Sequence, residues 1–180
     1  GMRFNKWLPG LKDAIYDHRY VFDEIGYNLK PLDLQAAMGL EQLKKLPELD
    51  SARRKNWEYL RAIFEPYEQY FHMPIATEKA DPCWFAFLLT IKENAPFTRF
   101  DIVNHLEEAK IQTRSYFSGN ILAHPGYFHM AQEHGDMNMK FPNAQLVTTN
   151  SFFLGTYKGL TDEKLDYIEK TVNNFFESVK

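Results

Sequence analysis

Apolar residues recur at helical spacing in some segments of the chain and run continuously in others, which predicts alternating helices and short strands. A first helix is expected to start at Pro31, because proline is tolerated in a first turn. Its small or apolar face comprises Ala36, Ala37, Leu40 and Leu43. Pro47 is expected to end or kink this helix, since proline cannot donate a backbone hydrogen bond. A second helix then follows to about Phe64, and one stripe of it is formed by Trp57, Leu60 and Phe64.

Short apolar segments between the helices are predicted to be strands of one sheet: residues 71–74, 84–92, 111–116 and 151–154. The segment 84–92 is apolar almost throughout, which is typical of a central strand covered on both faces. The segment 111–116 is short and is expected at an edge. Because strands and helices interleave around a small sheet, the predicted fold class is α+β, with a mostly antiparallel or mixed sheet packed with helices.

Further helices are predicted in the second half of the chain. Thr98 and Asp101 form a capping-box-like start for a helix over residues 99–109. Its expected inward residues are Phe100, Val103 and Leu106. A short helix is expected over 142–150, and a closing helix over 160–179. The closing helix repeats apolar residues at +3 and +4, namely Leu165, Ile168, Val172 and Phe176.

Residues 1–30 carry many aromatic side chains without a clear period, so they are interpreted as an N-terminal arm that docks on another surface. Residues 31–180 are long enough to form one domain with a true core. The dipeptide Gly1-Met2 is typical of an expression-tag remnant. We therefore expect the chain to be a piece of a larger protein.

Composition excludes several classes of protein. A hydrophobic fraction of 44% with 15 phenylalanines indicates a globular protein rather than a disordered one. The net charge of −3 gives no basic footprint, so nucleic acid is not an expected partner. No apolar run approaches the roughly 20 residues of a membrane span, so no membrane is expected either. Cys83 is the single cysteine, which excludes an internal disulfide and fits a cytoplasmic setting.

Candidate metal and nucleophile residues are instead assigned to packing. Three histidines recur every five residues: His124, His129 and His134. Pro125-Gly126 breaks any helix between the first two, so surface or loop-packing histidines are expected rather than metal ligands. Cys83 has no base nearby in sequence, and the chain contains no glycine-rich phosphate loop. The basic triplet Arg53-Arg54-Lys55 is expected to be a solvated helix face.

Asn28 and Arg114 are the polar residues with the clearest binding potential. Asn28 follows Gly26-Tyr27 just before a helix begins, where backbone N–H groups and the amide could meet an anion. Its alternative role is to hold a turn through its own side chain. Arg114 ends a short strand and could bind an anion as a planar fork. Its alternative partner is a carboxylate in a surface ion pair.

Several motifs, in one order along nearly the whole chain, resemble the DegT-type, vitamin B6-dependent enzymes that aminate or dehydrate nucleotide-linked sugars. The matching segments are Tyr16–Tyr20 (YDHRY), Gly26–Lys30 (GYNLK), Asp33–Gly39 (DLQAAMG), Asp81–Phe87 (DPCWFAF), Thr113–Asn120 (TRSYFSGN) and Gly159–Tyr167 (GLTDEKLDY). GYN with the following helix identifies the wider superfamily. YDHRY and the Phe-Ser-Gly-Asn turn are similar to its 3-dehydrase branch, in particular to the C-terminal portion of the CDP-4-keto-6-deoxyglucose 3-dehydrases.

The resemblance implies the small C-terminal domain of a fold-type I enzyme that works as a homodimer, with the large cofactor-binding domain absent from this chain. Asn28 is then expected to reach the cofactor phosphate across the dimer, and His18 to lie near the same cofactor. Residues on the substrate side are expected to be Lys30, Arg114, Phe117, Ser118, Gly119 and Asn120. The implied substrate is a nucleotide-linked 4-keto-6-deoxy sugar of lipopolysaccharide or deoxysugar biosynthesis, which loses its C-3 hydroxyl.

The implied cofactor is pyridoxamine 5'-phosphate or pyridoxal 5'-phosphate, whose pyridine ring stores electrons while the hydroxyl leaves. The base is a histidine in place of the aminotransferase lysine and is expected upstream, so no catalytic residue is assigned in this chain. The cysteines of an iron–sulfur cluster, where a member has one, would also lie in the missing part. The chain alone is expected to bind no cofactor and to be inactive. Two alternatives stay open: a sugar-nucleotide aminotransferase, and a non-catalytic binding or interaction module.

Overall fold

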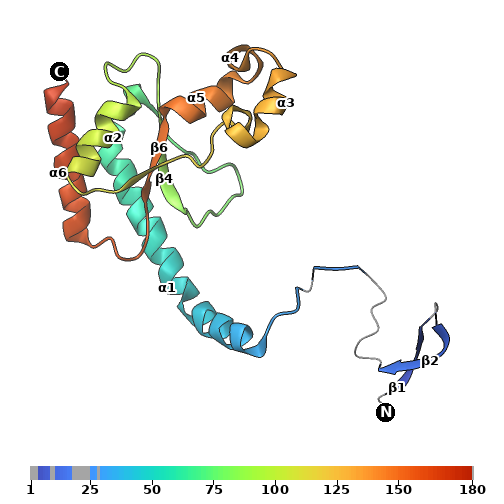
Figure 1. Ribbon diagram of the computed structural model, residues 1–180. Coiled ribbons are helices and arrows are strands. Elements are labelled where there is room, and N and C mark those ends of the chain that lie inside the picture. The colour runs from blue at the N-terminus through green and yellow to red at the C-terminus, as the bar shows by residue number, and fades with distance from the viewer. Residues whose placement is uncertain (1–3, 9–10, 18–24, 28, 180) are drawn as a thin grey trace. The chain divides into compact units, whose positions relative to one another are not determined.

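The computed structural model describes residues 4–8, 11–17, 25–27 and 29–179 (Figure 1). The chain divides into a part up to Leu43 and a part from Lys44 onward, and each is described by itself. The first part begins with an antiparallel pair, β1 (Phe4–Leu8) and β2 (Leu11–Asp17). The sequence did not predict these strands. Their pairing shifts register twice, between Phe4 and Lys6 and between Trp7 and Leu8, which disrupts the period of two that marks a strand.

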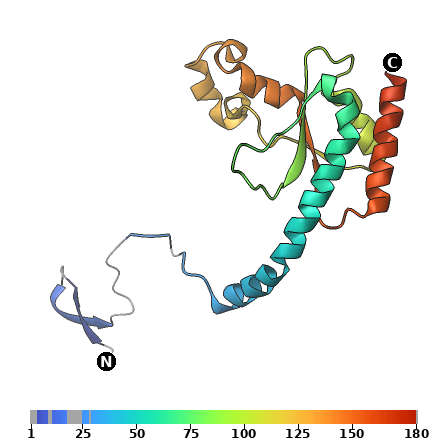
Figure 2. The ribbon, with the colours of Figure 1, turned by 180° about the vertical axis from the view of Figure 1, so that it is seen from behind.

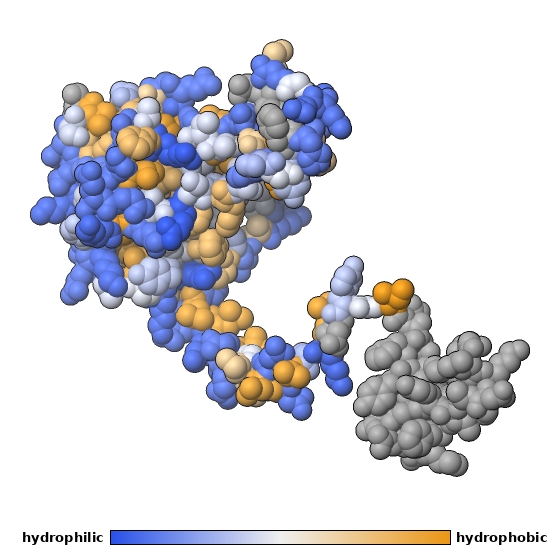
Figure 3. Space-filling view, in the orientation of Figure 1, coloured by the Kyte–Doolittle hydropathy of each residue, from blue (hydrophilic) through white to orange (hydrophobic). Residues whose placement is uncertain are grey.

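Helix α1 (Asp33–Phe64) runs through Pro47 without ending, so the predicted pair of separate helices is wrong. Proline removes one backbone hydrogen bond, but strong helix formers precede it at 43–46 and the C-terminal half is anchored in the core. In the first half of the helix the leucines and Met38 are exposed, and apolar residues lie among hydrophilic ones there in Figure 3. The described residues leave these apolar side chains uncovered, and the predicted apolar face of this half stays a prediction.

A four-stranded antiparallel sheet forms the centre of the second part, and its strand order is β3-β4-β6-β5. The strands are β3 (Phe71–His72), β4 (Ala86–Ile91), β5 (Thr113–Ser115) and β6 (Ser151–Gly155). A 3-10 helix, η2 (Glu65–Tyr70), connects α1 to β3. The predicted central position of 84–92 and the predicted edge position of 111–116 are both confirmed.

Three helices cover one face of this sheet: the C-terminal half of α1, α2 (Arg99–Glu108) and α6 (Asp162–Ser178) (Figures 1 and 2). The strand residues that point into this core are Phe71, Phe87, Leu89, Ile91, Phe152 and Leu154. The helices contribute Trp57, Leu60, Ile63, Phe64, Ile102, Leu106, Leu165, Ile168, Val172, Phe175 and Phe176. The predicted stripes of α1 and α6 and the α+β class are confirmed.

The predicted inward face of α2 needs a correction. Thr98 and Asp101 form the expected capping box, in which the Thr98 N–H donates to Asp101 Oδ2 at 2.7 Å. Phe100, however, is 70% exposed, whereas Ile102 and Leu106 are fully buried. Leu106 and the partly buried Val103 therefore face inward as predicted, and the correction concerns Phe100 alone, because Ile102 takes the inward position instead.

The second face of the sheet is only partly covered. Leu88, Phe153 and Arg114 are register partners across β4, β6 and β5, so their side chains share this face. Ala86 and Leu88 remain half-exposed, and the prediction that 84–92 is covered on both faces is therefore wrong for this face. Short helices follow β5: η3 (Ile121–Ala123), η4 (Pro125–Tyr127), α3 (Phe128–Gln132), α4 (Met137–Lys140) and α5 (Pro142–Asn150), which leads directly into β6 (Figure 1).

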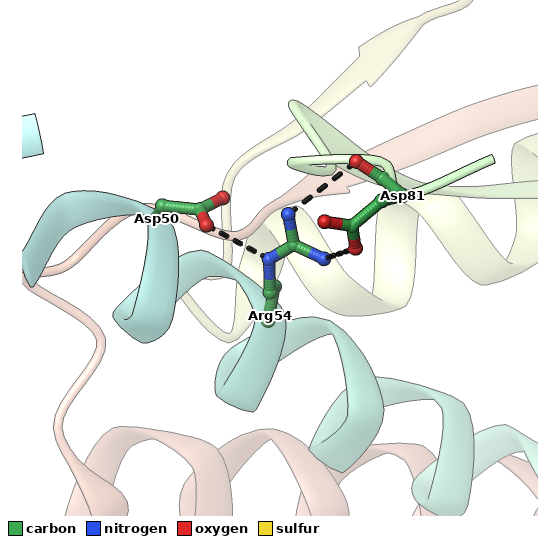
Figure 4. A network of polar contacts seen from close by, with 3 residues as sticks. All are labelled: Asp50, Arg54 and Asp81. Atoms are coloured by element: carbon green, nitrogen blue, oxygen red, sulfur yellow. Dashed lines mark hydrogen bonds and ion pairs between the residues drawn. The ribbon is translucent and has the colours of Figure 1, made fainter. Parts of the chain in front are cut away.

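The basic triplet on α1 is a solvated face only in part: the Lys55 side chain is 62% exposed, as predicted, whereas Arg54 is held between neighbouring carboxylates, which corrects the prediction for Arg54. The Arg54 guanidinium lies between two carboxylates in Figure 4: its Nε donates to Asp50 Oδ2 at 2.9 Å, and its terminal nitrogens bind Asp81. Lys55 Nζ pairs with Asp162 Oδ1 at 2.7 Å. Because Asp81 lies in the loop before β4, Arg54 fastens this loop to helix α1.

Candidate functional site

The predicted site residues fall into two groups. Asn28 and His18, the two predicted cofactor ligands, lie outside the described residues, so both assignments stay predictions. Lys30 is exposed just before α1. The remaining predicted residues, Arg114 and 117–120, come together at the end of β5, on the second part of the chain.

The turn that follows β5 is fixed in an uncommon backbone conformation. Phe117 has φ +48° and Gly119 has φ +57°, and a non-glycine residue is rarely found in this left-handed region. Two hydrogen bonds close the turn: Phe117 N–H donates to Ser115 O at 2.7 Å, and Gly119 N–H donates to Tyr116 O at 3.1 Å. A Cβ added at Gly119 would lie 2.4 Å from Thr148 Oγ1 on α5. Only glycine fits this position without displacing its neighbours.

Asn120 anchors the turn from inside. The residue is 4% exposed, and its backbone N–H donates to Thr148 Oγ1 at 2.7 Å. Its side-chain amide donates to Gln145 Oε1 at 3.0 Å, while its side-chain oxygen accepts from Leu122 N–H at 3.1 Å. His124 Nε2 adds a hydrogen bond to Ser118 O at 2.7 Å. These contacts give Asn120 a structural role in holding the turn, and a contact with substrate stays a prediction.

Arg114 projects from the edge strand on the sheet face without helices. It is exposed, and its Nη1 donates to Thr113 O at 3.1 Å. With the Gln112 amide turned over, the Gln112 side-chain oxygen also accepts from the guanidinium. Within the described ranges no carboxylate forms an ion pair with Arg114, but hydrogen bonds to Thr113 O and to the Gln112 side-chain oxygen engage its two terminal nitrogens, so an anion would have to displace or share them.

Glu107 supports the same strand from helix α2. Its Oε1 accepts hydrogen bonds from Thr113 Oγ1 at 2.7 Å and from Thr113 N–H at 2.6 Å. These two hydrogen bonds, with a smaller contribution from the nearby Arg114 charge, lower the pKa of the Glu107 carboxyl below its ordinary value. Glu107 is therefore an ionised carboxylate that accepts structural hydrogen bonds. It is not a proton donor at neutral pH.

Sequence reasoning missed three residues beside the turn. Phe85 precedes β4 and is 61% exposed, Phe153 lies on β6, and the Arg53 guanidinium carbon is 5.9 Å from the centroid of the Phe85 ring. The Phe85 ring is stacked on Phe117 with centroids 6.2 Å apart. Phe85 belongs to the DPCWFAF segment. Its exposure could not be predicted, because the exposure of one side chain depends on long-range packing rather than on a local pattern.

Other candidate chemistry is weaker. His124, His129 and His134 are all exposed, and across the residues that the structure describes no group of three or more metal-ligating side chains occurs. The neighbouring Asp50 carboxylate raises the pKa of the Cys83 thiol, so this exposed thiol is less reactive than an ordinary one. No helix in the described part of the chain is both long and apolar enough to span a bilayer.

A complete vitamin B6 cofactor site needs an acidic or basic partner for the pyridine nitrogen in addition to a phosphate site. The cavities beside Arg114 and Phe117 are lined, among the described residues, by aromatic, aliphatic, glycine, glutamine and basic side chains, without a carboxylate. The described residues therefore offer cationic groups, and no carboxylate, to the pyridine nitrogen and the phosphate. The predicted cofactor contacts of this chain come from the segment that contains His18 and Asn28.

Comparison with known proteins identifies the wider group. The sequence profile of the DegT/DnrJ/EryC1/StrS aminotransferase family matches residues 8–173. The dTDP-4-dehydro-2,6-dideoxy-D-glucose 3-dehydratase of Saccharopolyspora spinosa is 42% identical over 173 residues, which are 96% of this chain and 36% of that protein. The lipopolysaccharide biosynthesis protein RfbH of Salmonella typhimurium is 38% identical over 176 residues, or 98% of this chain and 39% of that protein. The chain thus spans well under half of either relative.

Among solved structures, the GDP-4-keto-6-deoxy-D-mannose-3-dehydratase of Escherichia coli, with bound hydrated PLP, superimposes with a TM-score of 0.69. It is 31% identical, and the match covers 86% of this chain and 38% of that protein. This match confirms the predicted fold, an α+β part of a fold-type I protein. With the profile covering most of its length, the chain belongs to the DegT/DnrJ/EryC1/StrS aminotransferase family.

Proposed function

We propose that this chain is the C-terminal part of a pyridoxamine or pyridoxal phosphate-dependent sugar-nucleotide 3-dehydratase, which removes the C-3 hydroxyl of a nucleotide-linked 4-keto-6-deoxy sugar. The observation that carries the proposal is the 42% identity, over 96% of this chain, with a 3-dehydratase that acts on a dTDP-linked sugar. The chain contributes substrate and cofactor contacts, and the reacting base lies outside it.

The geometry of the second part suits a substrate-facing role. The turn 116–120 is held by backbone hydrogen bonds and by buried Asn120, so the exposed side chains of Phe117 and Ser118 are positioned before any ligand arrives. Pre-positioned groups bind with a smaller loss of conformational entropy. Arg114 offers a planar pair of donors to an anionic part of the same ligand. Asn28 and His18 are proposed to reach the cofactor in a homodimer, and Lys30 to contact the substrate.

The test uses the full-length protein encoded by the reading frame that contains this chain. The protein is incubated with pyridoxamine phosphate and CDP-, dTDP- or GDP-linked 4-keto-6-deoxy sugars, and the products are followed by mass spectrometry. The proposal expects a product that has lost its C-3 hydroxyl. A protein that leaves all three keto sugars unchanged would contradict the proposal.

An aminotransferase of the same family is the second candidate, because the family as a whole is described by amination. The same assay separates the two activities, since an aminotransferase supplied with glutamate yields an amino sugar. The upstream sequence separates them independently: histidine at the cofactor-linked position indicates a dehydratase, and lysine an aminotransferase. A reading frame that begins at Met2 would instead favour a non-catalytic binding module. A cytoplasmic setting remains part of the proposal.

A further inference from the structure

Three phenylalanine rings from separate segments meet on the sheet face that the helices leave uncovered. Phe85 precedes β4, Phe117 lies in the turn after β5, and Phe153 lies on β6; we call these three residues the aromatic face. Their ring centroids are 5.8 to 6.2 Å apart. Phe153 is packed at the base, whereas Phe85 and Phe117 are 61% and 68% exposed. Two large rings are thus presented outward on a fixed support.

The backbone holds Phe117 outward against an energetic preference. Its φ of +48° is unfavourable for a residue with a Cβ, and such strain is found mainly at binding and catalytic sites. The strain persists because the turn around it is closed by backbone hydrogen bonds and by the contacts of Asn120.

A cavity of about 360 Å³ lies against the aromatic face. Its other lining residues are Pro74, Trp84, Ala86, Leu88 and Tyr116. Among these described lining residues, the Tyr116 hydroxyl and the Trp84 N–H are the side-chain hydrogen-bonding groups. A hexose carries hydroxyls around its whole ring and would leave most of them unpaired here, which is costly. A planar base can instead stack through its faces and keep its polar edge in water.

Positive charge borders the aromatic face on two sides. The Arg53 guanidinium lies over the Phe85 ring, and Arg114 is the cross-strand neighbour of Phe153. Phe153 also lines a second cavity of about 400 Å³, whose basic residues are Lys110, Arg114 and Lys164. None of the described residues that line the two cavities is acidic. The two cavities thus share Phe153, and one offers aromatic rings while the other offers cations.

From this arrangement we infer that the aromatic face stacks the nucleobase of the nucleotide-linked sugar, while Arg114, with Lys110 and Lys164, binds its diphosphate. The inference rests on the proposed function. It assigns the base of the nucleotide-linked sugar, rather than its sugar, to the aromatic face. Because every nucleobase has a π-face, the aromatic face selects for a base without choosing among bases.

The experiment is an NMR titration of the isotope-labelled 180-residue chain with four probes: CDP, cytidine, inorganic pyrophosphate and free D-fucose, a 6-deoxyhexose. CDP is expected to shift the amides of 85–88 and 115–118, and pyrophosphate only those around Arg114. Phe117→Ala is expected to weaken CDP roughly tenfold, as loss of one stacking ring does, and to leave pyrophosphate unchanged. Arg114→Ala is expected to weaken both.

Phe85→Ala gives an independent second variant, and Tyr127→Ala, which removes an exposed ring on η4 that lines neither cavity, is the control with no expected effect. The inference is overturned if millimolar CDP causes no saturable shifts, if the shifts lie elsewhere, or if neither aromatic-face variant weakens CDP. D-fucose shifts that match those of CDP would overturn the base assignment. The dehydration assay of the full-length protein is separate: activity with no CDP stacking refutes only this inference, and stacking without activity refutes only the proposed function.

Discussion

The substitution Gly119→Ala tests whether the turn after β5 is as rigid as its contacts indicate. The new methyl group meets two costs. Alanine in a left-handed conformation is unfavourable by about 1–2 kcal/mol, and the φ of Gly119 is +57°. The methyl carbon would also lie 2.4 Å from Thr148 Oγ1 and 2.8 Å from Thr148 Cα, so helix α5 must move. Overpacking of this kind costs about 1–3 kcal/mol. The expected loss of unfolding free energy is therefore about 2–5 kcal/mol.

Substitutions at two other glycines separate the backbone cost from the overpacking cost. Gly135 has φ +73° with no atom within 4 Å of an added Cβ, so Gly135→Ala isolates the backbone cost of about 1–2 kcal/mol. Gly126 also has no atom within 4 Å of an added Cβ, and its φ is outside the left-handed region. Gly126→Ala is expected to be neutral or to stabilise the protein by up to about 1 kcal/mol through the unfolded chain.

Urea denaturation followed by fluorescence of the stacked Trp57–Trp84 pair measures all three variants. With a slope of about 2 kcal/mol/M, Gly119→Ala is expected to lower the midpoint by about 1–2.5 M. Hydrogen exchange at the Asn120 amide, which donates to Thr148 Oγ1, is expected to accelerate in this variant alone. If Gly119→Ala cost no more than Gly135→Ala, α5 would yield freely to the methyl group, and the argument for a pre-positioned Phe117 would fail.

Three further predictions concern the core, acid stability and the full-length enzyme. Phe64→Ala, which empties a fully buried ring site, is expected to cost about 3–5 kcal/mol in thermal or urea unfolding, and a loss below about 1 kcal/mol would contradict the assigned core. The lowered pKa of Glu107 stabilises the fold above its ordinary value near 4.5, and this stabilisation is lost as the pH falls from there through the lower folded pKa. Glu107→Gln should therefore reduce stability at neutral pH and give a shallower decline in acid; parallel curves for both proteins would refute this role. In the full-length enzyme, Asn28→Ala should weaken cofactor retention roughly ten- to hundredfold by equilibrium binding, whereas Arg114→Ala should raise the KM for substrate, and the reverse pattern would exchange the two assignments.

The elements that local sequence rules specify were predicted well. The helix over 142–150 has the predicted bounds, and the capping box at Thr98 has the predicted partners, because both depend on residues three or four positions apart. Three strands are shorter than their predicted ranges, and β6 is one residue longer, since a strand ends where its partner ends and the partner is distant in sequence. The turn at 116–120 was singled out by its resemblance to a family. The strained φ of Phe117 could not be predicted from the amino-acid sequence.

The failures arise where long-range contacts override a local signal. Pro47 is a strong local breaker, but α1 continues because its second half is fixed in the core. The sequence around Arg54 indicates a solvated residue, because its partner Asp81 lies 27 positions later and comes close only in the folded chain. Phe100 fits an inward position by spacing alone, yet Ile102 and Leu106 occupy the interior. The aromatic face could not be predicted for the same reason, because Phe85, Phe117 and Phe153 meet only once the sheet has formed.

The sheet's two outer strands set how the domain can associate with other proteins. β3 has two residues and β5 has three, so neither margin offers the row of unpaired backbone groups on which an incoming strand could extend the sheet. Such short margins disfavour fibril-like growth and domain-swapped ribbons, which need a long, flat template. Assembly with other protein surfaces must therefore use side chains rather than shared backbone pairing, and a substitution that lengthened β5 would be expected to promote aggregation before it altered any ligand contact.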